Sequence, residues 1–338
     1  MSILVTGGAG YIGSHAILTL LQNGYDVISL DNYCNSSPKS LERVEEICLS
    51  KIKKLRGDIR DRHILKNIFS KYNVSTVIHF VGLKSVNESI KKPLEYYDTN
   101  LLGTLILLDE MQKANISNLI FSSSATVYGN PHYVPISEKH PVGEVINPYG
   151  RSKFMVEHIL RDFCNANSDA NITILRYFNP VGAHETGLIG EDPLGTPNNL
   201  FPYVAQVAIG KLPYLNVFGN KYMTKDGTGV RDYIHVVDLV EGHLAALKNL
   251  NRNRGLKVFN LGTGQGYSVL DIIDAFKLET GRDIPFRIVS ERNGDVAECW
   301  SDPSLANEQL SWVAKRTLNN MVEDAWRWQT MNPNGYKE

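Results

Sequence analysis

The chain has 338 residues, of which 43% are hydrophobic and 21% charged, and its formal net charge is −1. This is the composition of a globular protein with one large or two medium domains, and the balanced charge argues against nucleic acid or an acidic membrane as a partner. The nine histidines and four cysteines show no metal-ligand or disulfide spacing. We therefore expect no metal site and a cytoplasmic location, which the lack of a signal pattern or of a ~20-residue apolar stretch also favours.

The first half of the chain alternates predicted strands with predicted helices. Short apolar runs predict strands at 3–6, 27–30, 51–55, 76–80, 119–122 and 172–176. Apolar spacing near 3.6 residues predicts helices at 11–22, 41–49, 62–71, 94–114 and 149–165. This alternation predicts an α/β fold with a Rossmann-type, doubly wound parallel sheet and helices on both of its faces.

The sequence changes character after Asn179. Residues 183–198 are rich in Gly, Pro, Asp and Glu, which indicates a long ordered loop. Further helices are expected at 200–210, 238–250 and 269–279, with a strand at 258–261. We therefore expect a domain boundary near residue 180, between a sheet domain (1–180) and a smaller mixed α/β substrate domain (181–338).

A glycine-rich segment directly follows the first predicted strand. Gly7, Gly10 and Gly13 have the spacing G-x-x-G-x-x-G, a relative of the dinucleotide fingerprint. Gly7 permits a tight turn, Gly10 lets the backbone approach a pyrophosphate, and Gly13 lets the helix pack closely on the strand. The strand–glycine–helix context predicts a dinucleotide site, and a simple tight turn is the alternative.

Acidic residues follow the second and third predicted strands. Asp31 lies roughly 20 residues beyond the glycine turn, where a carboxylate accepts hydrogen bonds from ribose hydroxyls. Because a carboxylate at this place repels a 2′-phosphate, NAD is predicted rather than NADP. Asp58 lies where an adenine edge is expected. The alternatives are an ordinary turn residue for Asp31 and a helix cap for Asp58.

The pair Tyr149 and Lys153 is the strongest indication of catalysis. Residues four apart on a helix share a face, so the ammonium would lie beside the phenol. A nearby cation lowers the pKa of a tyrosine, and the pair therefore predicts a proton-transfer site. Ser124, at the end of a predicted strand, could relay a proton or hold a substrate oxygen. The alternatives are an exposed tyrosine with an unrelated lysine, and a serine bonded only to the backbone.

Longer segments resemble a known family. The chain is similar to extended short-chain dehydrogenase/reductases in the glycine turn, Asp31, Asp58-Ile59, the runs 79–84 and 122–129, and the Tyr149 and Lys153 pair. More narrowly, the segments 176–183, 197–200 and 227–236 resemble the UDP-glucose 4-epimerase family. The resemblance implies a resident NAD and a UDP-hexose substrate, with Tyr149 and Ser124 performing catalysis and Lys153 lowering the pKa of Tyr149.

The glycine turn and the resemblance together give the expected site residues. The cofactor is expected to contact Gly7, Gly10, Tyr11, Ile12, Gly13, Asp31, Asn32, Tyr33, Cys34, Asn35, Ser36, Asp58, Ile59, Phe80, Val81, Gly82, Leu83, Lys84, Tyr149, Lys153 and Phe178. The UDP-sugar is expected to contact Ser124, Tyr149, Asn179, Asn199, Leu200, Asn216, Val217, Phe218, Arg231, Tyr233, the segment from Arg292 to Asp295, and Cys299.

Several substrate assignments have alternatives. Arg231 and Arg292 are candidates to bind the two phosphates, or are solvated surface residues. Phe218 would pack on uracil, or fill the core. Asn199 would bind a phosphate or sugar group, or only cap the helix that follows it.

Cys299 takes the place at which members strict for UDP-glucose and UDP-galactose have a tyrosine. Members that also accept 2-acetamido sugars have a smaller residue there, often cysteine. The resemblance therefore implies that UDP-GlcNAc and UDP-GalNAc are also interconverted, and a buried packing cysteine is the alternative.

Rival functions fit the sequence less well. A nucleotide-sugar 4,6-dehydratase needs an Asp-Glu pair just after the catalytic hydroxyl residue, where this chain has Ala125 and Thr126. A UDP-glucuronate-modifying enzyme is a lesser rival. A non-catalytic NAD sensor is disfavoured because all three proton-transfer residues are present. The resemblance also implies a homodimer, and the helices at 94–114 and 149–165 are its candidate interface.

Overall fold

A computed structural model describes residues 1–193, 197, 199–250, 254–292 and 294–337. Its centre is a seven-stranded parallel sheet with the order β11-β6-β5-β4-β1-β2-β3. These strands are β1 (Ser2–Thr6), β2 (Asp26–Asp31), β3 (Lys53–Arg56), β4 (Val74–His79), β5 (Asn118–Ser124), β6 (Asn171–Tyr177) and β11 (Gly255–Leu261). The predicted Rossmann-type α/β fold is confirmed.

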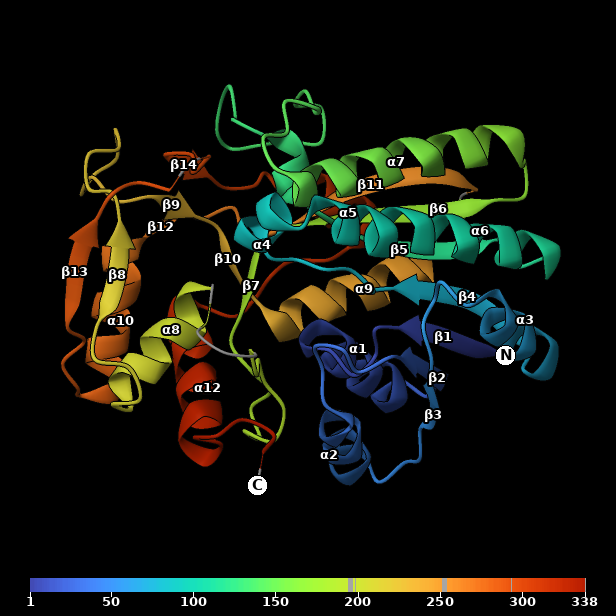
Figure 1. Ribbon diagram of the computed structural model, residues 1–338, viewed down its shortest axis with the longest axis horizontal. Helices are drawn as coiled ribbons and strands as arrows, with labels where there is room; N and C mark the ends of the chain where they lie inside the picture. Colours follow the sequence, from blue (N-terminus) through green and yellow to red (C-terminus); the bar gives the residue numbers. More distant parts are fainter. Residues whose placement is uncertain (194–196, 198, 251–253, 293, 338) are drawn as a thin grey trace.

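Helices cover both faces of this sheet (Figure 1). One face carries α1 (Tyr11–Gln22), α2 (Pro38–Cys48) and α9 (Val236–Leu250), and the other carries α3 (Arg62–Lys71), α6 (Gly103–Lys113) and α7 (Pro148–Ala166). Alternate residues of β1 belong to the two cores: Ile3 and Val5 pack on the α1 side, and Leu4 on the other. Burial on both faces explains why these strands read as continuous apolar runs.

Two predicted helices differ most from those observed. Helix α2 begins at Pro38, before the predicted residue 41, because Ser37 caps it and proline suits the first helical position. The predicted helix 94–114 consists of α5 (Pro93–Tyr96), the π-helix η1 (Tyr97–Leu102) and α6. A short helix before it, α4 (Val86–Lys91), was not predicted.

The second half builds a smaller group of elements around its own apolar core (Figure 1). It contains α8 (Leu200–Ala208), β8 (Leu215–Phe218), α10 (Val269–Thr280), β13 (Phe286–Val289) and α12 (Leu318–Met331). Short strands form two further small sheets, with the orders β10-β7 and β12-β9-β14: β7 (Asn179–Val181), β9 (Val230–Arg231), β10 (Tyr233–His235), β12 (Tyr267–Ser268) and β14 (Glu298–Cys299). The described residues of the predicted loop 183–198 form no helix or strand.

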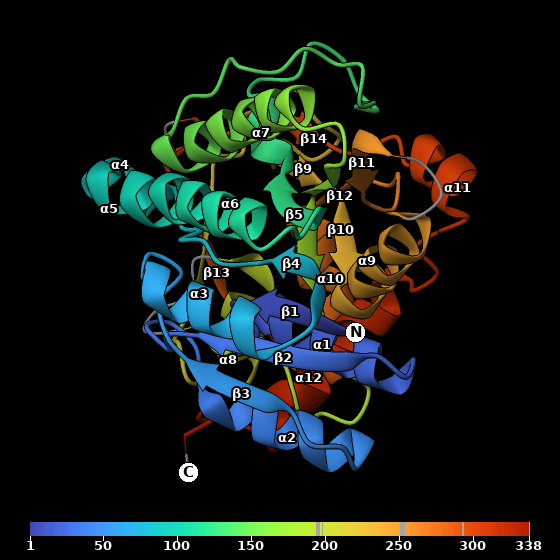
Figure 2. The ribbon, with the colours of Figure 1, turned by 90° about the vertical axis from the view of Figure 1, so that its right-hand side faces the viewer.

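The chain returns to the large sheet after residue 181. Strand β11 forms one edge of that sheet, α9 packs on α1, and α11 (Ser304–Leu310) packs on α9 and β11 (Figure 2). Segments from both sides of residue 180 therefore build the sheet layer, and the division of the chain at that residue stays a prediction. Among the described residues no helix is long and apolar enough to cross a membrane; a cytoplasmic location likewise stays a prediction.

Candidate active site

Most of the predicted cofactor residues lie at or just after the carboxyl ends of β1, β2, β3 and β4. The glycine turn lies directly against the segment that follows β4, because a Cβ on Gly7 would lie 3.0 Å from the Val81 nitrogen. A Cβ on Gly13 would lie 2.1 Å from the Gly7 carbonyl oxygen, so α1 can approach β1 only with glycine there. Helix α1 has no side-chain cap at Gly10, which leaves its first N–H groups free for a phosphate. These features fit a dinucleotide.

Asp31 is buried and organises the loops around it. One of its oxygens accepts from the Ala9 amide at 3.0 Å, and the other accepts from the Tyr33 amide and the Ser36 hydroxyl, each at 2.8 Å. A carboxylate has about four acceptor positions, so one remains for a ribose hydroxyl. The Asn32 amide donates to Asp58 at 2.9 Å, which joins the loops after β2 and β3.

Other expected cofactor residues near these loops divide into buried and exposed ones. Ile59 is buried, Ile12 packs on the α1-side core, and Cys34 and Asn35 are exposed. The Tyr11 hydroxyl donates to the Gly182 carbonyl at 2.7 Å and thereby connects the start of α1 to the second half of the chain.

The segment 80–84 is held by a residue that the sequence analysis missed. Asn100 accepts from the Leu83 amide at 2.8 Å, and its amide donates to the Leu83 carbonyl and the Ser152 hydroxyl. A Cβ on Gly82 would lie 3.3 Å from the Lys153 ammonium. The expected cofactor segment therefore touches α7, the helix that carries the predicted catalytic residues. A polar residue on the apolar face of the predicted helix 94–114 is the only signal that could have identified Asn100.

Helix α7 brings Tyr149 and Lys153 to the ends of β5 and β6. Asn147 caps the helix by accepting from the Gly150 amide at 2.8 Å. Lys153 donates to the Ser122 carbonyl at 2.7 Å and lies 4.8 Å from the Phe121 ring centroid. Burial lowers the pKa of Lys153 to about 8, although the Glu157 carboxylate opposes that change.

The pKa of the Tyr149 phenol is higher than expected, so the phenol keeps its proton up to a higher pH. Burial raises the pKa of Tyr149, while a hydrogen bond with Ser124 and the positive charge of Lys84 lower it. The expectation that Lys153 lowers this pKa below that of a free tyrosine is therefore wrong for the structure as described. Desolvation outweighs the charges present, and the cation acting on the phenol is Lys84.

Glu157, one turn beyond Lys153, was also missed. Its carboxylate accepts from the Arg176 guanidinium at 2.6 and 3.0 Å and from the Ser123 hydroxyl at 2.6 Å. Both side chains of the ion pair are only 2% exposed. The pair joins α7 to β6, next to the strand end that carries Ser124. Arg176 also donates to the Tyr128 hydroxyl at 2.9 Å, in the 3-10 turn η2 (Ala125–Tyr128) that follows Ser124.

Four expected substrate residues lie on the short strands β7, β9, β10 and β14. Asn179 of β7 pairs with Tyr233 of β10, and Arg231 of β9 pairs with Cys299 of β14. Arg231 donates to the Val230 carbonyl at 2.8 Å and lies 3.6 Å from Asp295. Cys299 packs against a buried cluster beyond Ser124 that includes Ala125 and Phe178. Burial raises the pKa of the Cys299 thiol to about 11.

A second group lies on β8 and the segment after β13. The Arg292 guanidinium stacks 3.7 Å from the Phe218 ring centroid, so uracil could use only the other face of that ring. Val217 is buried in the core of the second half, whereas Asn216 bonds Tyr203 and Arg287. Asn198 and Asn293, which belong to the predicted segments, lie outside the described residues.

Asn199 begins α8 together with Leu200, but its side chain does not cap the helix. Its amide donates to Glu191 at 2.8 Å, and Glu191 also accepts from the Lys84 ammonium at 2.9 Å. The alternative that the Asn199 side chain caps α8 is therefore wrong. Glu191, which the sequence analysis did not single out, connects an expected substrate residue to an expected cofactor residue.

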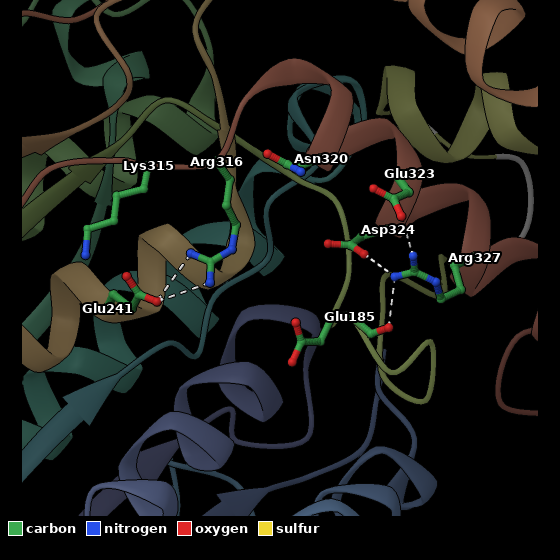
Figure 3. A pocket seen from close by; sticks show the side chains of 8 residues that line it. All are labelled: Glu185, Glu241, Lys315, Arg316, Asn320, Glu323, Asp324 and Arg327. Carbon is green, nitrogen blue, oxygen red and sulfur yellow. Dashed lines mark hydrogen bonds and ion pairs between the residues drawn. The ribbon is translucent and has the colours of Figure 1, made fainter.

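A separate charged pocket of about 680 Å³ lies at the junction of α9, α12 and the segment after β7 (Figure 3). Its arginines are paired, Arg316 with Asp238 and Glu241, and Arg327 with Glu323 and Asp324. None of the predicted site residues lines this pocket. The candidate active site is therefore the sheet edge around Tyr149.

Known proteins resemble the chain over nearly all of its length. The UDP-glucose 4-epimerase of Yersinia enterocolitica is 61% identical over 336 residues, 99% of either chain. The crystal structure of UDP-glucose 4-epimerase from Bifidobacterium longum, in complex with NAD+ and UDP, has a TM-score of 0.96 and 53% identity, covering 99% of this chain and 100% of that one. The UDP-Glc/GlcNAc 4-epimerase of Campylobacter jejuni has a TM-score of 0.85 and 37% identity, covering 98% and 99%.

A model of the NAD dependent epimerase/dehydratase family matches residues 3–262. The cofactor predicted from the glycine turn and Asp31 is the one on which this family depends, and that prediction is confirmed. With three quarters of its length matched by the family model, the chain belongs to the NAD dependent epimerase/dehydratase family.

Proposed function

We propose that the chain is a UDP-glucose 4-epimerase, which interconverts UDP-galactose and UDP-glucose by transient oxidation at C4 with tightly bound NAD. The observation that carries this proposal is the meeting of Tyr149, Ser124 and Lys153 at the sheet edge, beside a glycine turn that fits a dinucleotide. The named activity of relatives as similar as the Yersinia enterocolitica enzyme supports the substrate.

The chemistry follows from the lack of an acidic proton on C4 of a pyranose. Bound NAD⁺ would accept the C4 hydride and return it to the opposite face, and its positive ring would favour the phenolate form of the base. Tyr149 takes the proton of the C4 hydroxyl and later gives it back. Ser124, which is close enough to Tyr149 to lower the pKa of its phenol, would steady the C4 oxygen while the proton moves.

Lys153 and the arginines have separate roles in this scheme. The ammonium of Lys153 lies beside Gly82 of the cofactor segment, where it can bind the ribose hydroxyls of the nicotinamide half. Arg231 and Arg292, on the second half of the chain, would hold the diphosphate through charge-assisted hydrogen bonds. Fixing the diphosphate leaves the hexose free to turn and present its other face to the cofactor.

We propose further that the enzyme also interconverts UDP-GlcNAc and UDP-GalNAc. Cys299 pairs with Arg231 and packs against Ala125 and Phe178, so it lies between the expected phosphate and catalytic residues. A thiol at this position leaves space that a phenol ring would fill. The UDP-Glc/GlcNAc 4-epimerase of Campylobacter jejuni, similar over almost the whole chain, supports such a range of substrates within the family.

We also propose that the chain forms a homodimer through η1, α6 and α7. Large apolar side chains are exposed on these elements: Leu102 is 44% exposed, Leu105 41% and Met155 37%. An apolar groove lined by Leu101, Phe154, Met155, His158 and Ile159 lies between the same helices. A second copy of this face would remove the combined apolar surface from water.

The Tyr149→Phe variant tests the base. Removing the hydroxyl should reduce turnover of UDP-galactose by about 10²- to 10⁴-fold, because the C4 proton loses its acceptor. A coupled assay that measures UDP-glucose without added NAD gives the rate. The absorbance of the cofactor released from the purified variant shows that the variant had kept its NAD. Tyr133→Phe, an exposed tyrosine, is the matched control. Near-normal turnover in Tyr149→Phe would rule out the phenolic base.

The Lys84→Met variant tests the electrostatics of the base by its pH dependence. Lys84 lowers the pKa of Tyr149, so removal of this cation raises that pKa. Since the active form is the phenolate, the acid limb of kcat/KM should move to higher pH, measured on enzyme with a verified NAD content. Lys92→Met, which removes an exposed ammonium, should leave the limb in place. An unmoved or downward-shifted limb in Lys84→Met contradicts the assignment.

The Cys299→Tyr variant tests the substrate range. The phenol should fill the space next to the sugar and reduce turnover of UDP-GlcNAc by about 10- to 200-fold, while turnover of UDP-galactose is retained. Cys299→Ser keeps the space and should keep both activities. Product analysis of each purified protein with each sugar gives the comparison. A wild-type enzyme that does not convert UDP-GlcNAc refutes this part of the proposal.

Light scattering tests the homodimer. The wild type should have twice the mass of one chain. Met155→Glu should have the mass of a single chain, because the dimer would have to bury the new carboxylate in its interface. Met223→Glu, which adds charge at a side chain that is 94% exposed outside that face, should leave the mass unchanged. A monomeric wild type, or an unaltered mass for Met155→Glu, counts against this interface.

A further inference from the structure

The hydroxyl of Tyr222 is a buried polar atom without a partner. It is one of four such side-chain atoms found among the described residues. Burying a hydroxyl without a hydrogen bond is unfavourable, and native proteins seldom keep such groups unless a ligand or an ion completes them. Neither the glycine turn nor the family motifs singled out this tyrosine.

The loop between β8 and β9 is built to seat the Tyr222 ring. Gly219 has φ +81°, and a Cβ on it would lie 2.8 Å from the Tyr222 ring. Gly227 has φ +79°, and a Cβ there would lie 2.2 Å from the Asn220 carbonyl oxygen. The Tyr222 amide donates to the Gly227 carbonyl at 3.0 Å and closes the loop. The ring is thus fixed by backbone packing, without help from its hydroxyl.

The charges around the Tyr222 hydroxyl belong to the expected phosphate site. Burial raises the pKa of Tyr222, the carboxylates of Asp295 and Glu291 raise it further, and the guanidinium groups of Arg231 and Arg292 oppose them. The hydroxyl therefore lies within the field of both arginines and remains a neutral donor at physiological pH.

Arg292 has an unpartnered donor of its own. Its Nε atom is fully buried and makes no hydrogen bond, while its guanidinium carbon stacks on Phe218. A Cβ on Gly219, the residue after Phe218, would lie 2.8 Å from the Tyr222 ring and 2.5 Å from Glu291, the residue before Arg292. Two buried donors, a phenol O–H and a guanidinium N–H, thus belong to neighbouring side chains. A diphosphate offers several acceptor oxygens and a negative charge, and could therefore accept a hydrogen bond from each of these donors.

We propose that Tyr222 is a further substrate-binding residue, whose hydroxyl donates a hydrogen bond to the diphosphate of the UDP-sugar beside Arg231 and Arg292. The proposal rests on the proposed function, because that function supplies the diphosphate. The hydroxyl acts on binding of the nucleotide and takes no part in proton transfer at C4, so it should affect KM and leave kcat unchanged.

The test compares UDP binding to the wild type and to Tyr222→Phe, each as purified with its NAD, by isothermal titration calorimetry. The affinity for UDP should fall by about 10- to 100-fold, as expected for loss of a hydrogen bond to a charged group. In the assay with UDP-galactose, KM should rise while kcat stays unchanged. Tyr214→Phe, at the opposite end of β8 from Phe218, keeps its ring under Arg287 and should bind UDP as the wild type does.

A melting experiment separates binding from a structural role. Without UDP, Tyr222→Phe should melt no lower than the wild type, because the lost hydroxyl had no partner. With saturating UDP, the rise in melting temperature should be smaller for the variant than for the wild type.

Three results would overturn the proposal. Equal UDP affinity of Tyr222→Phe and the wild type would show that the hydroxyl makes no contact with the diphosphate. A lower affinity together with a lower melting temperature without UDP would give Tyr222 a structural role. If the wild type itself does not bind UDP, the proposed function fails and this proposal fails with it. If only Tyr222→Phe binds UDP as well as the wild type does, this proposal fails alone.

Discussion

The buried ion pair between Glu157 and Arg176 is the contact on which the proposed catalytic geometry depends. It joins α7, which carries Tyr149 and Lys153, to β6, and through Ser123 to the strand end at Ser124. Taking two charges out of water is costly, and only near-complete hydrogen bonding compensates for it. Here both oxygens of the Glu157 carboxylate accept hydrogen bonds, from Arg176 and Ser123. Such a pair tolerates few alternative positions of α7, so the three proposed proton-transfer residues keep one arrangement.

A second constraint joins the two halves of the chain around that geometry. Tyr11 bonds Gly182, Lys84 bonds Glu191, and Glu191 bonds Asn199, so the cofactor segments and the expected substrate segments share hydrogen bonds. Strand β11 and α9 return to the sheet layer as well. The proposed binding of a nucleotide sugar by the second half would thus be mechanically connected to the groups that set the charge near Tyr149.

Much of this could be predicted from the sequence, because local patterns determine it. The parallel strands appear as apolar runs buried on both faces, and the glycine turn and α7 carry their own spacing and caps. Glu157 and Glu191 could not be found in this way, and Asn100 only by its place on an apolar helix face, since each acts through partners far away in the sequence. The shift of the Tyr149 pKa was misjudged for a similar reason: a helix pattern gives the position of Lys153, but burial and the approach of Lys84 depend on the tertiary structure. The short strands β7, β9, β10, β12 and β14 are too brief to leave a periodic signal.

The central claim is that the hydrogen on C4 leaves the sugar as hydride and returns within the same site, without passing through water. The most direct measurement is NMR of the products formed from UDP-galactose in D₂O, together with the same reaction of substrate deuterated at C4. The account predicts that no solvent deuterium appears at C4 and that the deuterated substrate keeps its label in UDP-glucose. Incorporation of solvent deuterium at C4, or loss of the label, would contradict it.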